Sequence, residues 1–213
     1  MSYAAGSPAN ARALRQRWLG NLHPVLTREI LVPMAFVLAI LATNYSLTAV
    51  PNVKLFDLMV FVAGYTLGVR RGATVAVVAW LVYGNFNPWG TSTGSLLMTV
   101  MAMETVYALA GASVRRLLPP DRVRLGPGWA TVAFALAALA ATVAYDVTTN
   151  IYTGVSWARI ASSADVAQWV WTALLNPGAL FFFFMHAGSN VALFAALGPG
   201  MVRGVEWGKE AMP

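Results

Sequence analysis

The stretch LFDLMVFVAGYTLGVRRG, residues Leu55–Gly72, decides how this chain must fold. Its apolar run carries one carboxylate, Asp57, near the start and two guanidinium groups, Arg70 and Arg71, near the end. Adjacent arginines are costly in hydrocarbon and collect in water on the cytoplasmic side of a membrane. The stretch therefore predicts a membrane helix with its arginine end inside and Asp57 near the outer surface.

Three glycines, Gly64, Gly68 and Gly72, recur at every fourth position of this stretch. Residues four apart lie on the same face of an α-helix, and a face without side chains lets another helix approach closely. We therefore expect one continuous helix whose glycine face packs against a neighbouring helix.

The composition of the whole chain is that of an integral membrane protein. Of 213 residues, 58% are hydrophobic and 10% are charged, and the mean hydropathy is +0.63. No long polar linker divides the chain, so we expect a single membrane domain over residues 1–213. The net charge of +6 comes from basic residues in short loops between apolar runs, where membrane topology explains them without a nucleic-acid partner. The chain has no cysteine, which excludes thiolate chemistry, disulfides and cysteine-bound metals.

The apolar runs predict an all-α bundle of six transmembrane helices spanning residues 30–197. Residues 1–29 are expected to form a cytoplasmic N-terminal arm, and residues 198–213 a cytoplasmic tail. A Trp-rich segment, residues 152–177, is expected to form an interfacial cap with Trp157, Trp169 and Trp171 at headgroup level. The third helix is too short to cross a bilayer unless it tilts or continues into GNFNPWG. The expected helices are Ile30–Val50, Leu55–Gly72, Ala73–Tyr83, Ser95–Val114, Trp129–Asn150 and Gly178–Leu197.

The distribution of positive charge agrees with six spans and two cytoplasmic termini. With this topology, twelve of the fourteen basic residues fall on one side, and only Lys54 and Arg159 fall on the other. One span more or fewer would mix the two groups. The chain is therefore expected to be a multi-pass protein of the cell's inner (cytoplasmic) membrane, embedded in the lipid bilayer.

Four ionisable side chains lie within the expected spans: Asp57, Glu104, Asp146 and His186. A charge at the middle of a membrane helix costs about 2.5–3.5 kcal/mol on insertion scales, so such positions indicate function. The expected helix limits place all four in the outer half of the bundle. Structural roles stay open: Asp57 could be solvated, the other acids could pair with neighbouring helices, and His186 could be a satisfied interior histidine.

Amide and aromatic side chains gather at the same level, among them Asn44 and Tyr45. Aromatic faces with amides and a few carboxylates predict a pocket for a flat or amine-bearing solute. Three carboxylates against Lys54 and Arg159 favour a neutral or cationic ligand over a phosphate or dicarboxylate. The candidate ligand-binding residues are Asn52, Tyr83, Asn87, Trp89, Glu104, Asp146, Asn150, Trp157, His186 and Asn190.

Catalytic, metal and cofactor sites have weaker support. The chain has no Gly-x-Ser-x-Gly elbow, and His186 is the only histidine in the expected spans. It has no HxxxH or ExxH pattern for a divalent metal and no phosphate-binding glycine loop. We therefore expect no catalytic residue, metal ligand or cofactor in this chain, which itself cannot hydrolyse ATP.

Several motifs together resemble the substrate-binding S component of an energy-coupling factor (ECF) transporter, over nearly the whole stretch from Ile30 to Leu197. Besides six helices in about 200 residues, the motifs are Ala35-x-x-x-Ala39, Pro51-Asn52-Val53, the Gly64/Gly68/Gly72 spacing, Asn87-Pro88-x-Gly90 and Gly111 at the end of the fourth helix.

The resemblance implies a subunit that captures a vitamin, its precursor or a related micronutrient for import driven by ATP. It implies as partners a transmembrane coupling subunit and two cytoplasmic ATPases, with Ala35, Ala39 and Ala42 as the face that docks on the coupling subunit. It also implies a gate formed by residues 48–54 and release of the ligand when the protein topples in the membrane. Residue 2 is Ser rather than the His that follows Met in cobalt and nickel members, which disfavours a transition metal.

Two other classes of function stay open. A membrane scaffold or assembly subunit would use the glycine and alanine faces as interfaces, pair its buried acids and contain no void. An intramembrane enzyme would need His186 and two acids within hydrogen-bonding reach around a water-accessible point. A transport subunit predicts a closed outer cavity lined by the candidate residues.

Overall fold

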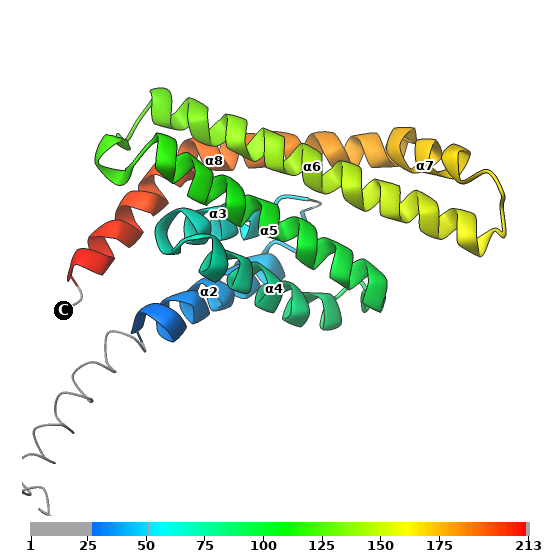
Figure 1. The fold of residues 1–213 in the computed structure, drawn as a ribbon, viewed down its shortest axis with the longest axis horizontal. Helices are drawn as coiled ribbons and strands as arrows, with labels where there is room; N and C mark the ends of the chain where they lie inside the picture. The colour runs from blue at the N-terminus through cyan, green and yellow to red at the C-terminus, as the bar shows by residue number, and fades with distance from the viewer. Residues whose placement is uncertain (1–26, 51, 212–213) are drawn as a thin grey trace, which may run out of the picture.

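The computed structural model describes residues 27–50 and 52–211, and these residues form an all-helical protein without strands (Figure 1). The predicted N-terminal arm lies outside the described residues except for residues 27–29. The elements are the π-helix η1 (Thr27–Leu31), the 3-10 helix η2 (Pro120–Arg122), and the α-helices α2 (Val32–Ser46), α3 (Phe56–Leu67), α4 (Val69–Asn85), α5 (Gly94–Leu117), α6 (Trp129–Ile160), α7 (Val166–Leu175) and α8 (Pro177–Ala211).

Four helical segments of the described chain are long and apolar enough to cross a membrane. They are consistent with a multi-pass membrane protein and confirm the all-α class of the prediction. The count of six spans and the side on which each terminus lies stay predictions. The four segments are Glu29–Ser46, Gly94–Leu117, Trp129–Ile160 and Pro177–Glu210.

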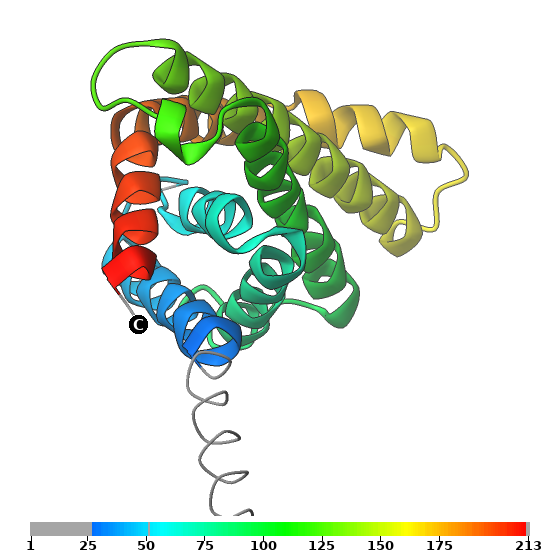
Figure 2. The ribbon, with the colours of Figure 1, turned by 60° about the vertical axis from the view of Figure 1, so that its left-hand side comes forward.

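Helix α3 is the centre of the molecule, with α2, α4, α5 and α8 around it (Figure 2). Every residue from Phe56 to Thr66 is buried. In its middle, the ring of Phe61 lies with its centroid 5.1 Å from that of Phe134 on α6 and 5.0 Å from that of Phe194 on α8. Twelve residues span only about 18 Å, so α3 is a core helix shorter than the bilayer.

The expected continuous helix over Leu55–Gly72 is wrong, because the chain breaks at Gly68. This residue has φ +91°, a conformation that glycine adopts readily, and it ends α3 and precedes α4. The predicted third helix, residues 73–83, is therefore the main part of α4, which begins at Val69. The glycines do not share one helical face: Gly64 and Gly72 face each other across the break, where a Cβ on Gly72 would lie 2.7 Å from the Gly64 Cα.

The prediction of a close helix contact at the glycines agrees with the structure. A Cβ added to Gly64 would lie 2.2 Å from the backbone oxygen of Ala108 on α5. In the reverse direction, a Cβ added to Gly111 would lie 2.1 Å from the backbone oxygen of Phe61. Helices α3 and α5 therefore touch backbone to backbone, at a separation that only glycine permits.

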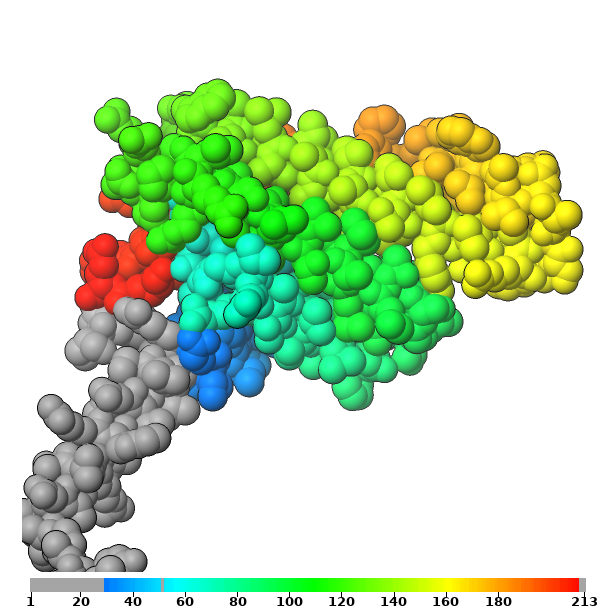
Figure 3. All heavy atoms as spheres, viewed as in Figure 1, coloured from blue at the N-terminus to red at the C-terminus, as the bar shows by residue number. Residues whose placement is uncertain are grey.

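The expected interfacial cap over residues 152–177 is also wrong in form. Helix α6 continues to Ile160 and is about 48 Å long at 1.5 Å per residue. Helix α7 folds back against α6, where Gly154 lies close to the backbone of Val170. The α6–α7 hairpin projects beyond the end of α5 (Figures 1 and 3).

The expected C-terminal tail is mostly helical. Helix α8 continues through the predicted boundary at Leu197 to Ala211 and is about 52 Å long. Residues 198–211 therefore belong to a long helix rather than to a separate tail.

Basic residues from separate elements meet at one end of the bundle, which we call the basic end. Arg71 on α4 pairs with Glu29 in η1, and Arg115 on α5 pairs with Glu206 on α8. Lys209 Nζ also lies 2.9 Å from Glu206 Oε2. These contacts bring together charges that the sequence assigned to the same side of the membrane.

Candidate functional site

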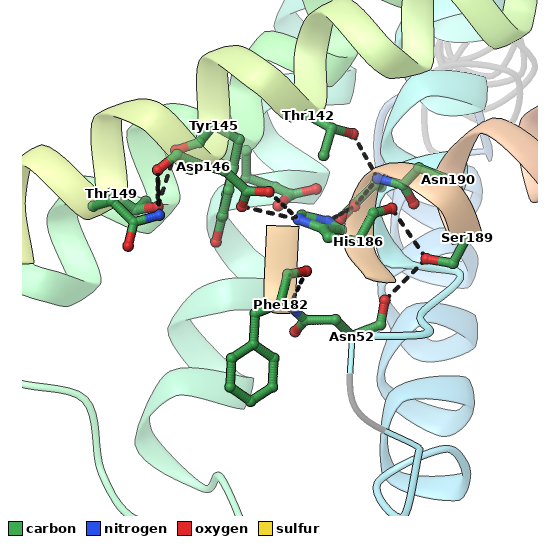
Figure 4. Close-up of polar contacts among 12 residues, drawn as sticks. Asn52, Thr142, Tyr145, Asp146, Thr149, Phe182, His186, Ser189 and Asn190 are labelled. Carbon is green, nitrogen blue, oxygen red and sulfur yellow. Dashed lines mark hydrogen bonds and ion pairs between the residues drawn. The ribbon is translucent and has the colours of Figure 1, made fainter. Parts of the chain in front are cut away.

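At the opposite end of α3, one histidine lies between two carboxylates from different helices (Figure 4). His186 Nδ1, on α8, is 3.0 Å from Asp146 Oδ1 on α6. His186 Nε2 is 2.6 Å from Asp57 Oδ2, in the first turn of α3. We call this region the acidic end.

The two hydrogen-bond partners of His186 determine its charge when both carboxylates are ionised. A carboxylate oxygen only accepts hydrogen bonds, so both ring nitrogens must donate when both carboxylates are ionised. That arrangement is a positive imidazolium between two negative carboxylates. The three groups together then carry one net negative charge, and the ammonium group of Lys54, which lines the same cavity as Asp57 and Asp146, offsets it.

A network of neutral polar side chains, Asn190, Thr142 and Tyr107, connects to the carboxylate of Asp57. Asn190, one turn beyond His186 on α8, donates from Nδ2 to Asp57 Oδ2 at 2.6 Å and to Thr142 Oγ1 at 2.8 Å. The hydroxyl groups of Thr142 and Tyr107 are 2.9 Å apart. Helices α3, α5, α6 and α8 thus each contribute a side chain, and the network holds Asp57 in place.

Glu104 on α5 is buried beside this network, with 1% of its surface exposed. Its Oε2 accepts a hydrogen bond of 3.0 Å from Trp80 Nε1 on α4. Its Oε1, like Asn190 Oδ1, has no hydrogen-bond partner among the described residues. The acidic end therefore retains unused acceptor atoms.

A cavity of about 190 Å³, the inner chamber, opens directly onto the acid–histidine cluster. Its wall combines two carboxylates, the imidazole, one ammonium group and three aromatic side chains. Its lining residues are Asn52, Lys54, Phe56, Asp57, Trp80, Tyr145, Asp146 and His186.

A larger cavity of about 410 Å³, the outer chamber, adjoins the inner one and shares Asn52 and Lys54 with it. Lys54 Nζ lies 5.4 Å from the centroid of the Tyr83 ring, which stacks on edge against Trp80. The lining residues are Asn44, Leu47, Thr48, Ala49, Val50, Asn52, Lys54, Tyr83, Asn87, Trp89 and Phe182.

Two residues of the connection between α2 and α3, Asn52 and Lys54, line both chambers, and Asn52 ties this connection to α8. Asn52 has φ +52° and donates from Nδ2 to the backbone oxygen of Phe182 at 3.1 Å. Its own backbone oxygen accepts from Ser189 Oγ at 3.0 Å (Figure 4). This connection is the segment that the resemblance marks as a gate.

The structure brings eight of the ten candidate ligand-binding residues to the acidic end. Asn52, Asp146 and His186 line the inner chamber, while Tyr83, Asn87 and Trp89 line the outer chamber with Asn52. Glu104 and Asn190 are buried in the supporting network.

The other two candidates lie elsewhere. Asn150 donates to the backbone oxygen of Asp146 within its own helix. Trp157 lies farther along α6, is 39% exposed and lines neither chamber. Asn150 is the last residue of the predicted helix, and Trp157 lies on the part of α6 that continues past it.

Five residues of the inner chamber were absent from the candidate set: Lys54, Phe56, Asp57, Trp80 and Tyr145. Asp57 was expected near water, but it is 5% exposed because α3 is recessed within the bundle. Its burial could have been inferred from its position in the first turn of an apolar stretch. Trp80 and Tyr145 sit within apolar runs, where nothing in the sequence separates them from ordinary core residues.

The predicted docking face borders a separate apolar groove of about 310 Å³ between α2 and the second half of α8. Ala35 and Ala39 form part of its wall opposite Met201 and Val205. Ala42 is exposed on α2 and lies outside the groove.

Comparison with protein family models, with characterised proteins and with solved structures found no match to this chain. The class of protein therefore rests on the fold and the site: an all-helical protein with apolar helices of membrane-spanning length and a buried acid–histidine cluster beneath two adjoining chambers.

Proposed function

We propose that this chain is the solute-binding subunit of an ATP-driven importer of the ECF type. In this proposal the bundle crosses the cell membrane six times, both termini are cytoplasmic and the acidic end faces outward. The solute, a vitamin, a precursor or a related micronutrient, binds in the inner and outer chambers. The protein itself carries no ATPase activity.

The single observation that carries the proposal is the hollow next to the acid–histidine cluster. Buried ionisable groups are costly in a membrane protein and are normally paired or face a polar cavity. Asp57 and Asp146 do both: each meets His186, and each also lines the inner chamber. In a scaffold subunit without a ligand, we would expect packed side chains in place of this polar cavity.

The charges around the inner chamber favour a ligand with a cationic or neutral polar group. Two carboxylates, one imidazole and the Lys54 ammonium group face the space. His186 and Lys54 offset the charge of the two carboxylates, but their oxygens can still accept hydrogen bonds from an N–H group of the ligand, as in an amine or an amidine, whereas a phosphate would meet two like charges. The aromatic side chains of Phe56 and Trp80, stacked with centroids 5.4 Å apart, supply a flat apolar wall.

The alternative of an intramembrane enzyme has one supporting observation, the histidine within reach of two acids. Both ring nitrogens of His186 already face carboxylates, so neither is free to take a proton from a nucleophile. The nearest hydroxyl on the same helix, Ser189 Oγ, donates to backbone oxygens instead. The geometry thus favours a group that holds charge over a general base.

The apolar groove beside Ala35 and Ala39 supports the second half of the proposal, the docking of a transmembrane coupling subunit. Small side chains let helices approach closely in a membrane. In our proposal a helix of the coupling subunit packs into this groove, and two ATPases on the cytoplasmic side drive the release of the solute.

The test is mass spectrometry of small molecules released from gently purified full-length protein. We expect an amine-bearing compound of low molecular mass from the wild type and its loss from the Asp146→Asn and Glu104→Gln variants. Arg116→Gln, at the exposed basic end, is the matched control and should retain the compound. Protein that is free of small molecules and copurifies only with other membrane subunits would contradict the proposal.

A further inference from the structure

We infer that Asn44 is a specificity-determining residue of the outer chamber and that it selects a ligand with adjacent hydrogen-bond donor and acceptor atoms, as in a carboxamide, a lactam or an amidine. This inference rests on the proposed function. It adds a second recognition element, distinct from the carboxylates of the inner chamber.

Asn44 is the most deeply buried polar residue of the outer chamber. It lies near the end of α2, belongs to the chamber wall and is 2% exposed. Neither Oδ1 nor Nδ2 has a hydrogen-bond partner among the residues that the structure describes. Its backbone oxygen, in contrast, accepts from Thr48 Oγ1 at 3.2 Å.

An unpartnered buried amide is unfavourable unless something else satisfies it. Nearly all buried polar groups in proteins have a partner, so an orphaned one needs a specific explanation. Here both the donor and the acceptor of one amide lack a partner among the described residues, and this residue belongs to the wall of the outer chamber. A ligand that offers one acceptor and one donor side by side would satisfy both at once.

The rest of the chamber restricts the ligand further. Tyr83 and Trp89 line the same chamber as Asn44 and favour a flat ring system. The outer chamber shares Asn52 and Lys54 with the inner chamber, so a single molecule can extend into both. We therefore assign a flat solute whose amide-like edge meets Asn44 and whose N–H-bearing polar group lies toward Asp57 and Asp146.

The experiment incubates full-length protein with a soluble small-molecule extract of cells and identifies retained compounds by mass spectrometry. The variants are Asn44→Leu, which removes the amide, and Asn44→Asp, which keeps the size but removes the donor. Asn85→Leu is the matched control, because Asn85 is exposed and bonds only within its own helix in the described structure.

We expect the wild type and the control to retain the same compounds, each with an adjacent donor and acceptor. Both Asn44 variants should retain them at least about tenfold less well, the effect of one lost hydrogen bond to a polar group. In the absence of extract, Asn44→Leu should melt at the same temperature as the wild type or higher, because it removes an unsatisfied buried group.

The remaining outcomes separate the two proposals. Equal retention by Asn44→Leu and the wild type, or retained compounds without a donor–acceptor edge, would overturn the role of Asn44 and leave the proposed function intact. A lower melting temperature of Asn44→Leu without extract would assign Asn44 a structural role and overturn the inference. If the wild type retains no compound, the proposed function itself fails, and this inference fails with it.

Discussion

The two ends of the bundle both contain charged side chains, but their surroundings differ. At the basic end, Arg71 and Arg115 pair with Glu29 and Glu206 on the partly exposed surface of the molecule. At the acidic end, Asp57 and Glu104 are buried, and Asp146 and His186 are only 14% and 12% exposed beside the inner chamber. A charge at the first end can be satisfied by water, whereas a charge at the second depends on the protein or on a ligand.

This difference teaches where to look for function in an apolar bundle. The basic end carries the larger number of charges, yet its pairs have modest energetic value because solvent competes for them. The acidic end carries fewer charges, but each is expensive to bury and is held by contacts from several helices. The position of the charges, rather than their number, marks the site.

The largest expected effect concerns the side of the membrane on which each end lies. The chain has no cysteine, so Phe86→Cys and Leu117→Cys each introduce a single thiol at a residue that is 71% and 82% exposed, respectively. In intact cells a membrane-impermeant maleimide should label the Phe86→Cys variant and leave Leu117→Cys unlabelled until the cells are permeabilised. Equal labelling of both variants in intact cells would break the assignment of the two ends to opposite sides.

The next effect is on stability at the acidic end. His186→Leu leaves Asp57 and Asp146 without their shared partner and should lower the free energy of unfolding by about 3–5 kcal/mol, as expected for half of a buried ion pair. Denaturation of the purified protein in detergent measures this change. The control adds Asp57→Asn and Asp146→Asn to the same variant, and it should recover most of the loss. If His186→Leu is as stable as the wild type, the cluster does not hold buried charge.

A smaller effect is expected between the two ends, where α3 and α5 touch. Gly111→Ala forces a methyl group against the backbone oxygen of Phe61 and should lower the free energy of unfolding by about 1–3 kcal/mol. Gly204→Ala, in α8, is the control, since a Cβ there meets no atom within 4 Å. That variant should be as stable as the wild type or more stable. Equal stability of the Gly111→Ala variant would mean that the two helices are farther apart than described.

The smallest effect is expected at the basic end. Arg71→Gln breaks the exposed pair with Glu29 and should change the free energy of unfolding by at most about 1 kcal/mol. The same denaturation measurement at low and high salt tests it, because salt screens an exposed pair. A loss as large as that of His186→Leu would remove the energetic difference between the two ends.

The sequence predicted the helical class, and it predicted that Glu104, Asp146 and His186 lie at one end of the bundle, because both follow from the distribution of apolar and ionisable residues. It could not predict the break at Gly68, since glycines at every fourth position fit a continuous helix equally well. The positive φ at that residue accompanies the contact of Gly72 with Gly64 across the break. Such a contact depends on tertiary packing rather than on local preference.

The burial of Asp57 and the length of α6 were missed for related reasons. The hydropathy pattern predicted that Asp57 lies at a helix end and therefore in water. In the structure the whole of α3 from Phe56 to Thr66 is buried, and this carboxylate is buried with it. Tyr152 to Trp157 have the composition of a membrane interface, yet the chain stays helical there because α7 packs along α6. In both cases a neighbouring element overrides the local signal.

The most direct test of the central claim is an experimental structure of the full-length protein in a lipid nanodisc, purified without washing out bound solutes. We predict density for a small molecule that extends through both chambers, with a polar group within hydrogen-bonding distance of Asp57 or Asp146. Chambers closed by packed side chains, with His186 still between the two carboxylates and no bound molecule, would contradict the claim.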